Sequence, residues 1–224
     1  RNGMGAKIFF PEKDIICIEG VKRLRPGDGV IPPDRIVAGT YLLAAAATRG
    51  EIIIENPPLG EMDGILEVYR KMGGQYDILG GKLIVNGKNT GSPLKLLETE
   101  VYPGFPTDLQ SPAMAVLATI PGESRIREQV FEDRFGTAAA LRKMGADITC
   151  KGKDAWVRGV YPLKGARVKA LDLRGGAALA VAALGAEGKT VIEDCSHIVR
   201  GYEDICRDIN ALGGKISWME SDTG

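Results

Sequence analysis

The sequence predicts an α/β (α+β) protein made of a repeated unit that contains two helices and several strands. Three observations lead to this prediction. A short turn of the Met-Gly or Leu-Gly type recurs roughly every 70 residues, an alanine-rich helix recurs between these turns, and a glycine-opened strand follows each such helix. Each unit is therefore expected to run helix, strand, helix, strand, strand, with a short strand leading in, such as Arg167–Ala170.

The recurring turns mark the ends of the second helices. They lie at Met4-Gly5, Met72-Gly73, Met144-Gly145 and Leu212-Gly213. Glycine just past a last helical turn adopts the left-handed conformation without a Cβ penalty. After each turn a hairpin pattern is expected, at Lys7–Gly20, Gln75–Gly87 and Asp147–Gly159, with a single strand, Lys215–Trp218, in the last copy.

The first helix of each unit is expected at Gly39–Thr48, Leu109–Thr119 and Gly175–Ala186. Small apolar side chains surround these helices on nearly all sides, so we expect them to be buried. The strands that follow are Gly50–Ile54, Gly122–Ile126 and Gly188–Ile192.

The order of the copies predicts how the chain is divided. Residues 1–20 are the tail of a preceding repeat unit, and residues 21–38, rich in proline and glycine, form a linker and lead-in segment. Residues 39–224 form a three-unit domain whose last unit is incomplete. A chain that starts partway through a repeat is expected to be part of a longer protein.

Composition excludes several classes of function. Lysine plus arginine equals aspartate plus glutamate at 29 each, so neither nucleic acid nor a membrane is an expected partner. No apolar run is long enough to cross a bilayer and no signal-peptide pattern is present, which favours a soluble, cytoplasmic protein. Four scattered cysteines and one histidine, His197, are poor material for a metal site, so no metal is expected.

Acidic residues precede the first helix of each unit: Asp34, Asp108 and Asp172. Helix capping is the simplest explanation. For Asp108 and Asp172 a functional role gains weight, because arginines are also expected at helix starts, where they oppose the helix dipole. These are Arg134, paired with Glu132, then Arg174 and Arg200. Converging arginines would bind a strongly anionic ligand, whereas surface salt bridges are the alternative.

Two other motifs carry no function. Gly185–Thr190 ends like a phosphate-binding loop, but a helix precedes it and a strand follows, the reverse of what that loop requires. His197 has no nucleophilic partner in evident reach and is expected to be structural.

Four stretches carry a resemblance to a known family: Phe105–Gln110, Val130–Phe135, Asp172–Ala177 and His197–Glu203. Together they resemble the UDP-N-acetylglucosamine 1-carboxyvinyltransferases, which are enolpyruvyl transferases. The likeness covers nearly the whole chain in order. It implies an inside-out α/β barrel of repeated βαβαββ units around buried helices, with this chain supplying one of the family's two domains.

The resemblance implies transfer of the enolpyruvyl group from phosphoenolpyruvate to the 3-hydroxyl of UDP-N-acetylglucosamine. Asp108 matches the candidate base that contacts the 3-hydroxyl, and Val130 matches a contact to the UDP-sugar. Arg174 and Arg200 match the arginines that hold phosphoenolpyruvate. Three residues match charged groups that line the cleft: Glu132, Arg134 and Asp172.

No organic cofactor or metal is implied. The second domain, with its phosphoenolpyruvate-contacting lysine and its general acid, would lie outside this chain, so the chain alone is expected to be inactive. Phe135–Ala138 and Val199 depart from the family's usual residues. The alternatives are 5-enolpyruvylshikimate-3-phosphate synthase, whose helix-start motifs differ, and a non-catalytic repeat domain of the same fold.

Overall fold

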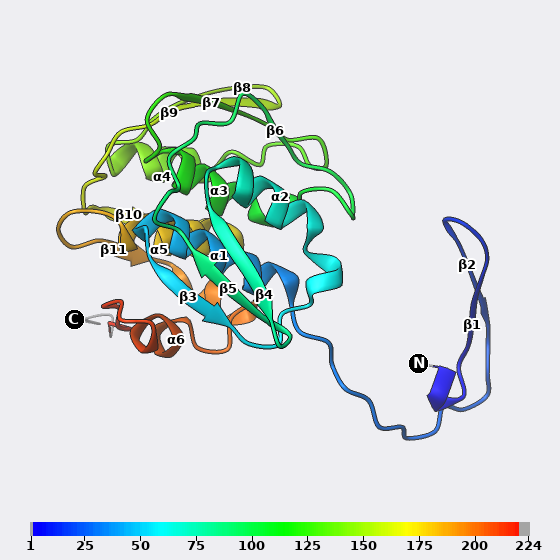
Figure 1. The fold of residues 1–224 in the computed structure, drawn as a ribbon. Coiled ribbons are helices and arrows are strands. Elements are labelled where there is room, and N and C mark those ends of the chain that lie inside the picture. The colour runs from blue at the N-terminus through cyan, green and yellow to red at the C-terminus, as the bar shows by residue number, and fades with distance from the viewer. Residues whose placement is uncertain (1, 220–224) are drawn as a thin grey trace, which may run out of the picture. The chain divides into compact units, whose positions relative to one another are not determined.

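The structure is a computed structural model that describes residues 2–219. The chain divides into two compact units, one ending at Pro32 and the other beginning at Pro33 (Figure 1). The first helix of the second unit begins at Arg35, which is four residues earlier than expected. Asp34 explains this start, because its carboxylate accepts a hydrogen bond from the Ile36 N–H at 2.6 Å and caps the helix.

The first unit is a β-hairpin with a short helical turn before it. The turn η1 (Asn2–Met4) leads into the antiparallel strands β1 (Lys7–Glu12) and β2 (Ile15–Glu19). Asn2 holds the start of β1, because its side chain both donates to the Ile8 carbonyl and accepts from the Ile8 N–H. The predicted hairpin after the first Met-Gly turn is confirmed.

The second unit contains three copies of the repeat. The first copy consists of α1 (Arg35–Thr48), β3 (Glu51–Ile54), η2 (Leu59–Glu61), α2 (Asp63–Lys71), β4 (Gln75–Leu79) and β5 (Lys82–Asn86). Its strands form an antiparallel sheet in the order β3-β5-β4.

The second copy has the same plan with a leading strand. It consists of β6 (Leu97–Glu98), η3 (Thr107–Leu109), α3 (Gln110–Leu117), β7 (Glu123–Arg127), α4 (Thr137–Lys143), β8 (Asp147–Lys151) and β9 (Asp154–Arg158). The sheet order is β6-β7-β9-β8, in which only the β6–β7 pairing is parallel.

The third copy consists of β10 (Arg167–Lys169), α5 (Leu173–Leu184), β11 (Val191–Glu193), η4 (Cys195–Arg200) and α6 (Ile205–Ala211). One expectation is wrong here. Lys215–Trp218 is not a strand, and the Asn210 side chain instead bonds both backbone polar groups of Ile216.

The turn glycines are confirmed as left-handed C-caps. Gly5, Gly73, Gly145 and Gly213 have φ between 85° and 94°, a region that costs other residues strain. These turns therefore end the preceding helical segments at equivalent points of each copy.

Helices α1, α3 and α5 form the core, and the sheets lie outside them (Figure 1). All eight residues of α3 are buried. Small side chains permit this packing, since a Cβ on Gly39 of α1 would lie 2.3 Å from Leu109 Cδ1. The starts of α3 and α5 lie close together in this core, since Asp108 bonds Arg174 in the first turn of α5.

Within residues 2–219, no helix has the length and apolar character needed to cross a membrane. The same residues contain no cluster of three or more histidine, cysteine, aspartate or glutamate side chains suited to a metal ion.

Candidate active site

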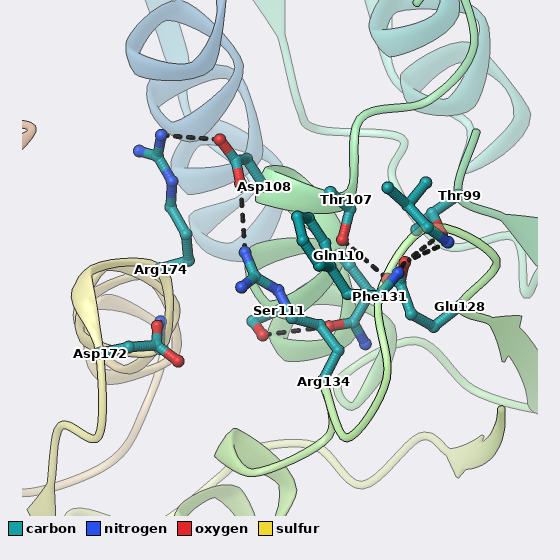
Figure 2. Close-up of polar contacts among 12 residues, drawn as sticks. Thr99, Thr107, Asp108, Gln110, Ser111, Glu128, Phe131, Arg134, Asp172 and Arg174 are labelled. Carbon is teal, nitrogen blue, oxygen red and sulfur yellow. Dashed lines mark hydrogen bonds and ion pairs between the residues drawn. The ribbon is translucent and has the colours of Figure 1, made fainter. Parts of the chain in front are cut away.

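Asp108 lies in η3, immediately before α3, and its carboxylate is shared by two arginines (Figure 2). Oδ1 accepts from Arg134 Nη2 at 3.1 Å, and Oδ2 accepts from Arg174 Nη2 at 2.8 Å. The Asp108 side chain is 35% exposed, whereas those of Arg134 and Arg174 are 23% and 17% exposed. The structure thus brings together three of the predicted site residues from two copies of the repeat.

The three acids expected at helix starts have different roles. Asp34 caps α1, and Asp172 caps α5 by accepting from the Gly175 N–H at 2.7 Å. Asp108 makes no side-chain cap. Of the three, only Asp108 forms ion pairs with arginines. It is therefore the acid whose contacts suggest a role in the reaction rather than in helix capping.

Arg174 lies in the first turn of α5, as predicted, with its cation at the positive end of the helix dipole. Asp108 compensates this charge on one side. The second terminal nitrogen, Nη1, is buried and has no hydrogen-bond partner among the described residues. A buried guanidinium N–H without an acceptor is unfavourable, and an anionic ligand would satisfy it.

Tyr202 supports this part of the site from the third copy. Its hydroxyl lies 2.8 Å from Thr40 Oγ1, and both side chains are buried. Burial raises the pKa of the Tyr202 phenol, while the hydrogen bond to Thr40 and the charge of Arg174 act in the opposite direction. The phenol therefore remains neutral and bonds Thr40 of α1.

Arg134 extends from the loop between β7 and α4 rather than from a helix. It precedes α4 by three residues and lies over the Phe131 ring, 5.3 Å from its centroid. Glu132, on the same loop, is exposed and forms no ion pair with Arg134 among the described contacts. Arg134 is therefore bonded to Asp108 and not to Glu132 in the described part of the chain.

Arg200 does not open a helix, so that expectation is wrong. It is the last residue of η4, it is exposed, and α6 begins only at Ile205. Among the described residues, Arg200 forms no hydrogen bond or ion pair with Asp108 or Arg174.

Sequence reasoning missed Glu128, which is 1% exposed and stands beside the site. The signal was available in strand alternation. Ser124 and Ile126 of β7 are buried, and period-two alternation places residue 128 on the same face. The burial of Glu128 was not expected, because a charged residue just after a strand is usually exposed to solvent.

Val130 lines an open groove of about 1020 Å³. Four carboxylates line that groove, those of Asp63, Glu67, Glu98 and Glu100, and Lys71 is its single cation. A diphosphate would be repelled there. The cluster that contains Arg134 and Arg174 is therefore the better place for an anionic ligand.

A family model described as EPSP synthase (3-phosphoshikimate 1-carboxyvinyltransferase) matches residues 2–209. The chain is 44% identical over 217 residues to UDP-N-acetylglucosamine 1-carboxyvinyltransferase 2 of Carboxydothermus hydrogenoformans, covering 96% of this chain and 52% of the relative. It is 43% identical over 218 residues to UDP-N-acetylglucosamine 1-carboxyvinyltransferase of Desulfofundulus thermocisternus, covering 88% of that relative.

The chain spans about half the length of most of the curated relatives that it matches. Among solved structures, the enolpyruvyl transferase NikO from Streptomyces tendae matches with a TM-score of 0.84 at 26% identity, covering 96% of this chain and 52% of that one. EPSP synthase from Acinetobacter baumannii matches with a TM-score of 0.70 at 18% identity, covering 98% and 54%, a likeness of fold alone.

Proposed function

Because the chain belongs to the EPSP synthase family of enolpyruvyl transferases, we propose that it is one domain of a UDP-N-acetylglucosamine 1-carboxyvinyltransferase. The complete enzyme would transfer the enolpyruvyl group from phosphoenolpyruvate to the sugar 3-hydroxyl and release phosphate. This is the first committed step of peptidoglycan synthesis, which we place in the cytoplasm. The observation that carries the proposal is the Asp108 carboxylate held between Arg134 and Arg174.

In the proposed reaction, Asp108 accepts the proton of the 3-hydroxyl as the oxygen attacks the central carbon of phosphoenolpyruvate. A proton from a group outside this chain adds to the methylene carbon. Loss of a methyl proton and departure of phosphate then restore the double bond. Arg174 and Arg200 neutralise the phosphate and carboxylate, while Val130, Glu132, Arg134 and Asp172 contact the sugar or line the cleft.

The partners in this proposal are both substrates and a second domain, which supplies the lysine and the general acid. No cofactor takes part, because addition and elimination exchange only protons and phosphate. Arg174 has a further requirement that fits this role, since its buried Nη1 has no hydrogen-bond acceptor among residues 2–219.

Two alternatives have weaker support. The curated relatives at 41–44% identity carry the UDP-sugar name, whereas EPSP synthase structures match at 18–19%. A non-catalytic repeat domain would have no need to keep Asp108 between two arginines near a partnerless guanidinium nitrogen.

The test is phosphate release after the chain is joined to the other half of the Carboxydothermus relative. We expect turnover with phosphoenolpyruvate and UDP-N-acetylglucosamine but none with shikimate 3-phosphate. Asp108→Asn should lower kcat by roughly two to four orders of magnitude, the usual effect of removing a general base. Turnover with shikimate 3-phosphate in place of the UDP-sugar would refute the assignment.

A further inference from the structure

We propose that Glu128 is a positioning residue that sets Asp108 against the loop bearing Arg134, an inference that rests on the proposed function. Glu128 follows β7 and is 1% exposed. Its Oε1 accepts from Thr99 Oγ1 at 2.7 Å and from the N–H groups of Val130 and Phe131 at 2.9 and 3.1 Å. Its Oε2 accepts from Thr107 Oγ1 at 2.9 Å.

This carboxylate is held by neutral donors. None of the ion pairs among residues 2–219 includes Glu128. A buried carboxylate persists only when hydrogen bonds replace its hydration, and the bonds it accepts are stronger than those between neutral groups. The four donors are therefore fixed around Glu128, and each of them belongs to a segment that borders the site.

The contact with Thr107 reaches the candidate base. Thr107 and Asp108 are consecutive residues of η3 (Figure 2). Glu128 bonds Thr107, and Arg134 from the far end of the same loop bonds Asp108. Loop 128–134 is thus joined to η3 at two adjacent residues, so the direction of the Asp108 carboxylate depends on both contacts.

The contacts with the loop backbone fix its path. Besides the Val130 and Phe131 amides, the Gln129 N–H donates to Thr99 Oγ1 at 2.9 Å, and that hydroxyl donates to Glu128. Three successive amides therefore depend directly or indirectly on one carboxylate. Val130, the proposed sugar contact, is in the middle of this run.

The experiment compares Thr107→Val and Glu128→Gln in the complete chain, with Thr119→Val as the matched control. Thr119 is also buried, but its hydroxyl donates only to the Val116 carbonyl at 2.8 Å. Two signals are recorded: NMR resonances of the Val130 and Phe131 amides and the Arg134 guanidinium, and calorimetric affinity for UDP-N-acetylglucosamine.

Thr107→Val should leave the Val130 and Phe131 amide resonances in place but shift the Arg134 resonance. It should also weaken UDP-N-acetylglucosamine binding about tenfold, the equivalent of one hydrogen bond to a charged group. Glu128→Gln should move all three resonances and weaken binding at least as much, because an amide nitrogen cannot accept a hydrogen bond. Thr119→Val should change neither signal.

An unchanged Arg134 resonance and unchanged sugar affinity in Thr107→Val would overturn the proposal even if Glu128→Gln fails to fold. If the unmodified chain does not bind UDP-N-acetylglucosamine at all, the proposed function has lost support. The Arg134 resonance then still decides the positioning role, with a shift supporting it and no shift rejecting it.

Discussion

At the scale of single residues, Asp108 forms ion pairs with the arginines that are proposed to bind substrate or line its cleft. Arg134 and Arg174 both donate to its carboxylate. An incoming phosphate or carboxylate must therefore share or displace this internal anion. The acid is consequently both the proposed base and a competitor for the arginines.

This competition predicts an unusual result for Asp108→Asn in the isolated chain. The affinity for inorganic phosphate and phosphoenolpyruvate should rise about five- to tenfold, since a partly exposed ion pair contributes about 1 kcal/mol. Calorimetric titration measures this.

Asp154→Asn is the matched control for that measurement. Asp154 also bridges two arginines, Arg125 and Arg127, but on the outer sheet. It should leave anion affinity unchanged. Equal affinities in Asp108→Asn and the unmodified chain would show that the arginines and the ligand do not share one site.

The sequence predicted these residues unequally. Arg174 was found because an arginine at a helix start opposes the helix dipole and therefore needs an explanation. Asp108 was found because such arginines are expected near it. The orientation of Arg134 toward Asp108 and the burial of Glu128 depend on the loop between β7 and α4. A loop without periodicity carries little information about which way its side chains turn, so these contacts could not be derived.

At the scale of elements, the β7–β9 pair carries a pH-sensitive contact. Hydrogen bonds from Arg125 and Arg127 lower the pKa of Asp154 from 3.8 to about 2. A carboxyl whose pKa is lower in the folded state stabilises the fold above its unfolded pKa, and this contribution is lost as pH falls through the folded value.

Melting curves of the unmodified chain and Asp154→Asn should therefore differ most above about pH 5. We expect a gap of about 1 to 2 kcal/mol, reduced by partial solvent exposure, that closes by about pH 2. A gap that is constant from pH 2 to 7 would mean that the shape of the side chain, not its charge, is what matters.

Helices and turns were predicted well because their signals are local. The four turn glycines and the alanine-rich helices follow from backbone conformation and side-chain size. The final strand at Lys215–Trp218 failed for the opposite reason. A strand needs a neighbouring strand to pair with. In the described chain the backbone N–H and carbonyl of Ile216 bond the side chain of Asn210 instead.

At the scale of the whole molecule, the site is partly exposed to solvent, with the Asp108 side chain 35% exposed. Asp108, Arg134 and Arg174 come from this chain, but the proposed general acid and the lysine do not. Positioned groups supply most of the rate of such a reaction. The three groups that this chain supplies are not sufficient for the proposed reaction.

The isolated chain should therefore release no phosphate from phosphoenolpyruvate and UDP-N-acetylglucosamine, even at high protein concentration. Adding the other half of the Carboxydothermus relative should restore release. Turnover by the chain alone at a rate comparable to that of the joined protein would show that the second domain is dispensable.

The complete burial of α3 has a consequence for the timing of motion in the site. Its amides are shielded on every side, so their exchange with solvent requires the surrounding core to open. Asp108 lies two residues before this helix, whereas Arg134 lies on a loop. When a ligand arrives, we therefore expect the backbone at Asp108 to stay in place, and the contact between Asp108 and Arg134 to adjust through the side chains and the loop.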